Sequence, residues 1–253
     1  MGEMSEMGAA GGVLPAVLVA PAKLTLSLRV TGRRADGYHL LDAEMVTLDL
    51  ADRLELSEGD ELEIVSEVSS AHGAIPAGDD NLVRRALFLA GRSAFVRLHK
   101  RIPAGAGLGG GSADAAAVLR WAGITDPESA ARLGADVPFC VVGGRARVRG
   151  VGEIVEPLDF DEVAAARFTL LSPPLHVQTA AVYRAWDDLA GPQGDNGNDL
   201  EPAALKVEPR LAEWRDRLGD ATGQTPRLAG SGATWFVEGE FPGEGGLVVR
   251  VSR

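Results

Sequence analysis

The chain has 253 residues, a formal net charge of −11 and a single cysteine, Cys140. This length fits one domain or two small ones, and the excess of acidic residues argues against a nucleic acid as a partner. A single cysteine cannot form an internal disulfide, and the sequence has no Cys/His cluster with metal-ligand spacing. Hydrophobic residues make up 45% of the chain and charged residues 24%, which excludes a disordered chain and predicts a globular core.

The N-terminal segment has the pattern of neither a membrane span nor a secretion signal. Its apolar stretch, 13–22, is interrupted by Pro15 and Pro21 and is shorter than the roughly 20 residues that cross a bilayer. The first basic residue is Lys23, so the basic start of a signal peptide is missing. We therefore expect a cytoplasmic protein with no membrane partner, whose first dozen residues form a frayed extension.

The apolar periodicity alternates between strand and helix values along the chain, which predicts a mixed α and β protein. In the first half the pattern predicts strands over 24–30, 54–56 and 62–64, and a helix that Asp80 or Asn81 caps and that runs to about Ala90. A strand over 95–102, a glycine-rich turn, helices over 112–122 and 127–133, and a strand or hairpin over 145–155 follow.

The second half fits a smaller α/β unit. It has a strand over 168–172, a helix with Val182, Tyr183 and Trp186 on one stripe, a loop over 191–198 and a helical pattern over 202–218. A second glycine-rich turn within 227–237 and a last strand over 247–251 complete it. The boundary between the halves lies within 157–166, which gives domains 1–160 and 161–253.

A glycine-rich segment joins the end of a strand to the start of a helix. Five of its glycines, Gly105, Gly107, Gly109, Gly110 and Gly111, lie within seven residues. Glycines allow positive φ and leave no Cβ between backbone N–H groups and a phosphate, and a helix N-terminus adds roughly half a positive charge. We expect an anion site, with Ser112 as the helix cap and as a hydroxyl that reaches phosphate or magnesium.

The alternative for this segment is a tight turn with no ligand. Five glycines would then cost on the order of 1 kcal/mol each relative to alanine where regular structure could serve, so a bound polyphosphate explains the segment better. The segment is not a P-loop, because Gly111 stands where that motif needs lysine. A dinucleotide fingerprint does not fit either, because no acidic residue about 20 positions later ends a strand.

Three segments resemble the motifs of the GHMP small-molecule kinases. They are Pro-Ala-Lys at 21–23, the glycine segment at 103–113 and Gly-Ser-Gly-Ala-Thr at 230–234. Further segments, at 31–39, 134–139, 150–153 and 198–201, are similar to the branch of this superfamily that acts in the non-mevalonate isoprenoid pathway.

The resemblance implies a two-domain α+β GHMP kinase fold. Its N-terminal α/β domain carries the glycine-rich phosphate loop, and its C-terminal ferredoxin-like α/β domain is trimmed here. The activity implied is transfer of a phosphoryl group from ATP, with Mg²⁺, to the 2-hydroxyl of a cytidine-diphosphate-linked methylerythritol. This small molecule would be the partner, and we expect a monomer or a weak homodimer.

By the same resemblance, Lys23 and Asp136 are the catalytic pair. Asp136 would accept or orient the proton of the attacking hydroxyl, and Lys23 would hold the hydroxyl and the carboxylate and neutralise charge. A loose phosphoryl-transfer transition state needs little more than such positioning and charge. The alternative is a purely structural role for both residues. The lysine would then extend from a strand to solvent, and the aspartate would cap a turn before Pro138.

The resemblance also assigns binding residues. The ATP phosphates would contact Pro103, Ala104, Gly105, Ala106, Gly107, Leu108, Gly109, Gly110, Gly111, Ser112 and Ala113, and the adenosine would contact Asn81 and Lys100. The cytosine would lie against Tyr38, His39 and Tyr183, and Gly230, Ser231 and Gly232 would reach toward the phosphates or the substrate. Core packing is the alternative for Tyr183. For 198–201 the alternative is a helix start that Asn198 or Asp199 caps.

The sequence departs from the family at three places. Thr25 stands where the family has asparagine, the chain between Trp121 and Gly134 is short, and residues 238–246 replace a helix before the last strand. Three other functions stay open. The first is a homoserine, mevalonate or sugar kinase, which substrate competition would identify. The second is a nucleotide-binding relative that has lost catalysis, which would bind ATP without turnover. The third is a structural protein, which would not bind ATP and magnesium.

Overall fold

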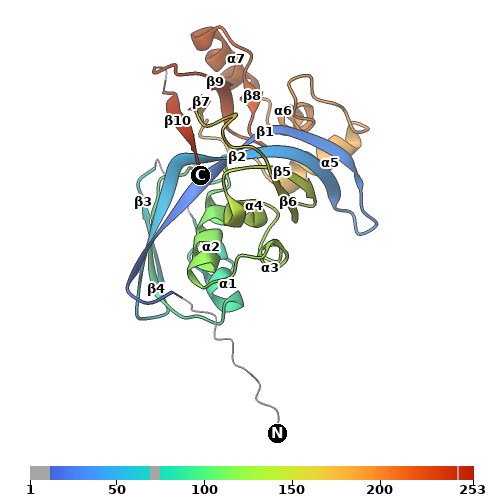
Figure 1. Cartoon of the computed structure of the whole chain (residues 1–253). Helices are drawn as coiled ribbons and strands as arrows, with labels where there is room; N and C mark the ends of the chain where they lie inside the picture. The colour runs from blue at the N-terminus through green and yellow to red at the C-terminus, as the bar shows by residue number, and fades with distance from the viewer. Residues whose placement is uncertain (1–11, 69–74, 244) are drawn as a thin grey trace.

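The computed structural model describes residues 12–68, 75–243 and 245–253, so the predicted N-terminal extension lies almost wholly outside the described residues. Two long antiparallel strands, β1 (Ala16–Arg33) and β2 (His39–Ser57), run through the centre of the molecule (Figure 1). The sequence predicted only parts of them, because three register shifts in β1 interrupt its alternation.

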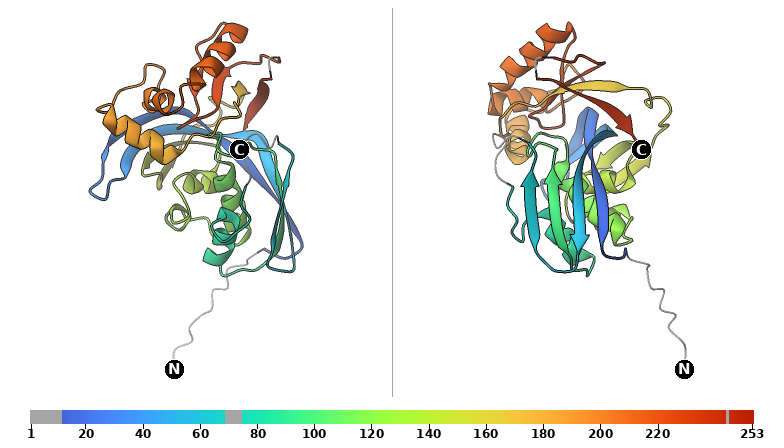
Figure 2. Two further views of the ribbon diagram at one scale, coloured as in Figure 1. Left: turned by 180° about the vertical axis from the view of Figure 1, so that it is seen from behind. Right: turned by 90° about the vertical axis from the view of Figure 1, so that its left-hand side faces the viewer.

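The opposite edge of β2 pairs in turn with three strands. These are β5 (Arg145–Gly150), β10 (Leu247–Ser252) and β4 (Phe95–Lys100), while β3 (Leu62–Ser66) lies parallel to β4 and β6 (Ile154–Pro157) pairs with β5. Four helices lie behind β3, β4 and the adjoining parts of β1 and β2 in the right-hand view of Figure 2: α1 (Leu82–Leu89), α2 (Gly110–Trp121), α3 (Pro127–Ala131) and α4 (Val137–Val142). The other face of this sheet is open in the same view.

Helix α2 packs closely at the centre of this layer because its inner residues are small. Its run of alanines over 115–117 is buried together with Val118 and Leu119. Short side chains let α2 approach β1, α1 and α4, which are its main neighbours. Helix α4 was not predicted, because it has only six residues, nearly all of them apolar, and so shows no helical periodicity.

The C-terminal unit consists of a small antiparallel sheet and three helices. Its strands have the order β10, β7 (Arg167–Leu171), β9 (Trp235–Glu238) and β8 (Arg227–Leu228). The helices are α5 (Thr179–Asp188), α6 (Glu201–Val207) and α7 (Leu211–Thr222). Because β10 pairs with both β7 and β2, it joins the two sheets, and the domain boundary at 160/161 stays a prediction.

The helix predicted over 202–218 is wrong in one respect, because the chain forms two helices there. Pro209 disfavours helical torsions at the residue before it, and Glu208 has φ −136° and ψ 86°. Between β9 and β10, the residues that the structure describes contain no helix, as the sequence predicted.

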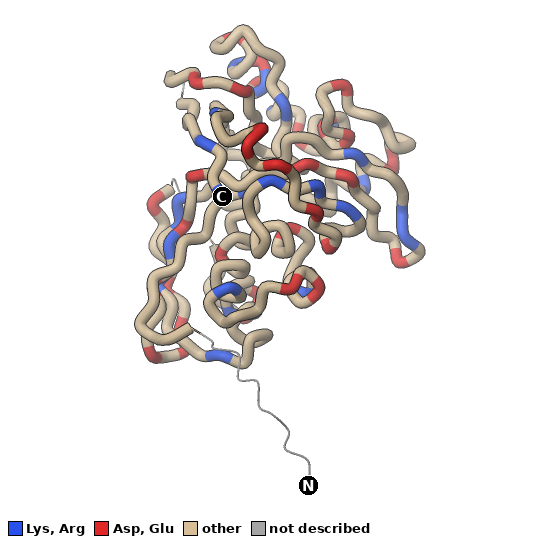
Figure 3. Tube along the Cα trace, viewed as in Figure 1, with Lys and Arg blue, Asp and Glu red and all other residues tan. Residues whose placement is uncertain are grey.

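No helix in the described part of the chain is long and apolar enough to cross a membrane, and the longest, α2 and α7, have 12 residues each. Figure 3 shows that the charged residues of both signs are interspersed along the strands and loops, rather than separated into acidic and basic halves.

Candidate active site

The glycine-rich loop lies where the sequence predicted it, between the end of β4 and the start of α2. Gly105, Gly107 and Gly109 have positive φ of 67°, 78° and 69°. Gly109 is the N-cap of α2 in the left-handed conformation, and the helix already begins at Gly110. The prediction that Ser112 caps this helix is therefore wrong, because the glycine turn lets the helix start two residues earlier and leaves the Ser112 side chain on the first turn.

Most of this loop lines a cavity of about 430 Å³. The lining includes 103–107 and 109–111 from the loop, Ser112 and Asp114 from α2, and the predicted Asn81 and Lys100. Leu108 and Ala113 are buried in the core instead. Asn81 also caps α1 as predicted, because its side-chain oxygen accepts a hydrogen bond from Val83 N at 2.9 Å.

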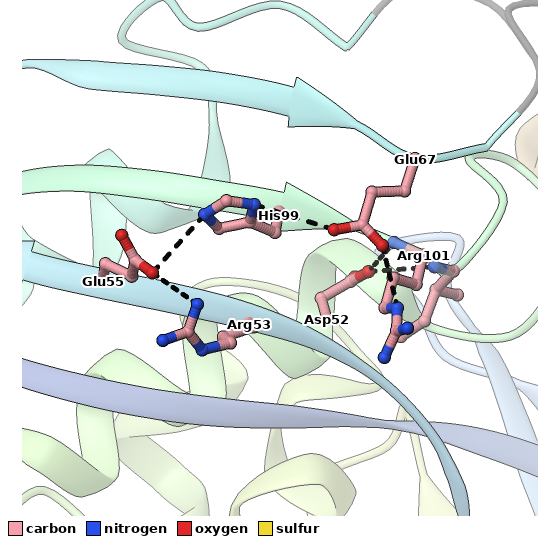
Figure 4. A network of polar contacts seen from close by, with 7 residues as sticks. Asp52, Arg53, Glu55, Glu67, His99 and Arg101 are labelled. Atoms are coloured by element: carbon pink, nitrogen blue, oxygen red, sulfur yellow. Dashed lines mark hydrogen bonds and ion pairs between the residues drawn. The ribbon is translucent and has the colours of Figure 1, made fainter.

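A buried carboxylate, Asp52, fixes the strand end that leads into the loop. One of its oxygens accepts hydrogen bonds from the backbone N–H groups of Arg101 and Ile102, at 2.6 and 2.9 Å. Figure 4 shows Asp52 turned toward Arg101, beside a chain of polar contacts that joins Glu67, His99 and Glu55 on the more exposed face of the strands. Those more exposed pairs contribute little stability individually, whereas the hydrogen bonds of Asp52 are shielded from water.

Lys100 joins Asp52 to the second turn of α2. Its ammonium group forms ion pairs with Asp52 and with Asp114, the latter at 2.7 Å, and all three side chains are buried. Burial alone would lower the pKa of Lys100, but the charges of Asp114 and Asp52 raise it above its ordinary value. Burial raises the pKa of Asp114 to about 7, and the negative charge of Asp52, which shares the same ammonium group, raises it as well.

We expect the Asp114→Asn variant to lose part of the pH dependence of stability. The unfolded chain releases the Asp114 proton near pH 4, whereas the folded chain holds it to about pH 7, so this group's contribution to stability is lost as the pH rises through that range. The decline should be about 4 kcal/mol in the wild type, at roughly 1.4 kcal/mol for each pH unit between the two pKa values, and absent in Asp114→Asn. Urea unfolding of both proteins between pH 4 and 8 measures it, and parallel curves would contradict the raised pKa.

Lys23 and Asp136, which are 113 positions apart, lie next to each other as the resemblance predicted. The Lys23 ammonium nitrogen is 3.3 Å from an Asp136 carboxylate oxygen, and it donates a hydrogen bond of 3.1 Å to the Thr25 hydroxyl. Register shifts of β1 on both sides of Lys23 re-aim its side chain into the molecule. Asp136 precedes α4 but makes no capping hydrogen bond, and about a third of its side chain is exposed.

The second glycine turn, Gly230 to Gly232, packs against the first. Asn198 holds it, because its side-chain amide donates hydrogen bonds to the carbonyl oxygens of Leu228 and Gly230, at 2.8 and 2.7 Å. The side chain of Ser231 is hydrogen-bonded to Thr179 at the start of α5, at 2.9 Å.

Neither Asn198 nor Asp199 is the N-cap of α6, which is Leu200. The predicted helix start is confirmed, and the Asn198 side-chain oxygen accepts a hydrogen bond from Leu200 N, just before the helix, at 2.9 Å. Asp199 does not cap the helix, because its carboxylate binds β1 through Val30 N and Arg29.

We expect Asn198→Asp to destabilise the protein although it changes only one atom of the side chain. A carboxylate cannot donate to the two carbonyl oxygens, so both would be left without this partner at a cost of roughly 2–4 kcal/mol. Asn198→Ala should lose a similar amount. Urea unfolding measures the difference, and an Asn198→Asp protein as stable as the wild type would contradict the assigned hydrogen bonds.

The structure brings two of the three predicted base-binding residues together. The rings of His39 and Tyr183 are stacked with centroids 4.8 Å apart and planes 23° apart. Tyr38 is not part of this stack, because it is 63% exposed and lies near the Arg34 guanidinium, and its role stays a prediction. Burial raises the pKa of Tyr183 well above its ordinary value, so its hydroxyl stays protonated.

A second cavity, of about 260 Å³, adjoins the first. Its lining includes Lys23, Thr25, Asp136, Tyr183 and the turn 230–232. Gly105, Gly107 and Ser112 line both cavities. The glycine loop therefore lies between the larger cavity and a space that contains a lysine and a carboxylate.

Sequence reasoning missed Asp52, Asp114 and Asp187, each of which holds a predicted site residue. A signal for Asp52 exists, because it is in phase with Leu54 and Leu56 on the buried face of β2. A charged residue at a core-facing strand position needs a buried partner. The sequence has no comparable signal for Asp187, which binds His39 from a distant helix.

The fold and the two facing glycine turns define a GHMP kinase, and the family model GHMP kinases N terminal domain matches residues 81–144. A 4-diphosphocytidyl-2-C-methyl-D-erythritol kinase from Paracoccus denitrificans is 41% identical, over 86% of this chain and 84% of its own. The crystal structure of a 4-(cytidine 5'-diphospho)-2C-methyl-D-erythritol kinase is similar with a TM-score of 0.68 and 35% identity, over 90% of this chain and 91% of the other.

The chain belongs to the 4-diphosphocytidyl-2-C-methyl-D-erythritol kinase family within the GHMP kinases. The predicted family and the predicted α+β fold class are thereby confirmed. A homoserine kinase from Cytophaga hutchinsonii, with 18% identity and a TM-score of 0.54 over 90% of this chain and 86% of its own, shares the fold alone.

Proposed function

We propose that the protein transfers the γ-phosphoryl group of ATP to the 2-hydroxyl of 4-diphosphocytidyl-2-C-methyl-D-erythritol, a step of isoprenoid precursor synthesis. The observation that carries this proposal is the shared wall of the two cavities, formed by Gly105, Gly107 and Ser112. Phosphates held at this wall would meet an acceptor hydroxyl held beside Lys23 and Asp136. The names of the similar kinases support the identity of the acceptor.

In the proposed reaction the acceptor oxygen attacks the γ-phosphorus, and the bond from that phosphorus to the oxygen of ADP breaks. Asp136 takes the proton of the hydroxyl, because its carboxylate is partly exposed to the cavity and free of a capping hydrogen bond. Lys23 stabilises the carboxylate before the transfer and the negative charge that develops during it. The backbone N–H groups of the glycine loop and the N-terminus of α2 bind the phosphates.

Magnesium would accompany ATP and neutralise phosphate charge. Within the residues that the structure describes, no group of three or more His, Cys, Asp or Glu side chains could hold a metal ion. This fits an ion bound mainly by phosphates and water, which needs only one or two protein ligands. The Ser112 hydroxyl, at the wall of both cavities, is our candidate for such a ligand. The cytoplasmic location and the monomeric or weakly dimeric state stay predictions.

Competition between acceptors tests the proposal. ATP consumption by the purified protein should depend on 4-diphosphocytidyl-2-C-methyl-D-erythritol, while mevalonate, homoserine and galactose should neither support turnover nor compete with it. Turnover on one of these three alcohols alone would show that the protein is a GHMP kinase with a different substrate. ATP binding without turnover on any acceptor would show that catalysis is lost.

A further inference from the structure

We infer that Asp187 is a positioning residue that fixes the tautomer of His39 and thereby lets the site prefer cytosine to uracil. The inference rests on the proposed function, because it concerns the base of that substrate. The two residues are 148 positions apart, and the His39 Nε2 nitrogen lies 2.8 Å from an Asp187 carboxylate oxygen. Only 9% of the His39 side chain is exposed, so water does not replace this contact freely.

The neighbourhood of His39 comes from one face of α5. Tyr183, Trp186 and Asp187 are spaced three and four residues apart, so a helix presents them on the same side. Tyr183 stacks on the His39 ring, and Trp186 meets it edge-on with centroids 5.5 Å apart. Tyr183 also lines the cavity of Lys23 and Asp136, so the His39 ring is stacked on a residue that forms the wall of the proposed acceptor site.

The carboxylate determines which nitrogen of the neutral ring has the proton. An ionised carboxylate only accepts hydrogen bonds, so Nε2 must donate, and Nδ1 keeps its lone pair. In the described part of the chain, Nδ1 has no hydrogen-bond partner and is available to a ligand. The other carboxylate oxygen of Asp187 lies 3.5 Å from the Arg33 guanidinium, which holds the carboxylate from its second side.

A hydrogen-bond acceptor at this position distinguishes the two pyrimidines. Cytosine has an amino group at C4 that can donate to Nδ1, whereas uracil has a carbonyl oxygen there that would face the lone pair. A site built to bind a donor rejects an analogue without it, because the polar group of the site is left unpaired. Without Asp187 the ring could adopt the other tautomer or rotate, and the preference would weaken.

The test compares Asp187→Ala with Asp188→Ala, which removes the same charge from an exposed neighbour on the same helix. Steady-state kinetics is measured with the cytidine-linked substrate and with its uridine-linked analogue. We expect Asp187→Ala to raise KM for the cytidine-linked substrate about tenfold, to leave kcat within about threefold and to reduce the preference for cytidine about tenfold. Asp188→Ala should behave as the wild type does.

The conservative variant separates positioning from a general structural role. Asp187→Asn keeps the size of the side chain, but its NH2 group can face Nε2 while its oxygen faces the Arg33 guanidinium, so it should weaken the cytidine preference with little change in Tm. An unchanged preference in Asp187→Ala would overturn the inference. The inference would also be overturned if kcat fell equally with both substrates in Asp187→Ala and Tm fell as well, because a structural defect does not distinguish the bases. If the wild type does not turn over the cytidine-linked substrate, this result contradicts the proposed function itself, whatever the Asp187 variants do.

Discussion

Replacing Asp136 by asparagine is expected to lower kcat by about 10³-fold while ATP binding stays intact. The amide has nearly the size and shape of the carboxylate, but it cannot accept the proton of the acceptor hydroxyl. It also removes the negative charge 3.3 Å from the Lys23 ammonium group. Steady-state turnover with the cytidine-linked substrate measures the loss, and calorimetry measures ATP binding.

The matched control is Glu128→Gln, which removes one charge from an exposed residue of α3. It should leave kcat within about twofold of the wild type, because surface substitutions of this kind change little. Lys23→Ala should resemble Asp136→Asn, since the two side chains form one ion pair. An Asp136→Asn enzyme with more than a tenth of the wild-type kcat would contradict the role of this carboxylate.

Among the single glycine-to-alanine substitutions in the phosphate loop, Gly107→Ala should destabilise the structure most. An added Cβ would lie 2.3 Å from the carbonyl oxygen of Ala229 and 2.8 Å from that of Gly232, and φ is +78° at this position. One oxygen belongs to the second glycine turn and the other to the residue just before it, so the two turns would have to separate. We expect a loss on the order of 3 kcal/mol in unfolding free energy, and loss of ATP binding.

Gly111→Ala is the matched control for this prediction. It lies in the same loop motif, but on the first turn of α2, and the nearest atom to an added Cβ is Leu82 Cδ1 at 3.6 Å. Alanine in a helix should stabilise the fold by up to about 1 kcal/mol. Urea unfolding of the two variants should therefore change in opposite directions. Equal stability would show that the glycine turns do not meet as closely as the structure places them.

Local signals in the sequence predicted much of the fold and the position of one glycine-rich loop. Asn81 before an apolar stripe predicted the start of α1, and the cluster of glycines after a strand predicted an anion site at the start of α2. Both depend on neighbours in the chain, so a single sequence contains them. The same local reasoning placed the cap of α2 at Ser112, because it could not foresee that Gly109 adopts the left-handed conformation.

Contacts between distant segments could not be predicted from the residues alone. The approach of Lys23 to Asp136 was expected only through the resemblance to a family, and its geometry depends on register shifts in β1 that no sequence pattern marks. The ion pairs of Lys100 join three elements, β2, β4 and α2. Their partners are fixed by the packing of the whole layer.

The most direct test of the proposed reaction is identification of the product by ³¹P NMR after incubation with ATP, magnesium and 4-diphosphocytidyl-2-C-methyl-D-erythritol. We expect a new phosphomonoester signal on the tertiary carbon, one for each ADP formed, with the diphosphate link to cytidine intact. The Asp136→Asn protein should not form it. Release of inorganic phosphate without a phosphorylated acceptor, or a phosphate on another hydroxyl, would contradict the arrangement of the two cavities around the glycine loop.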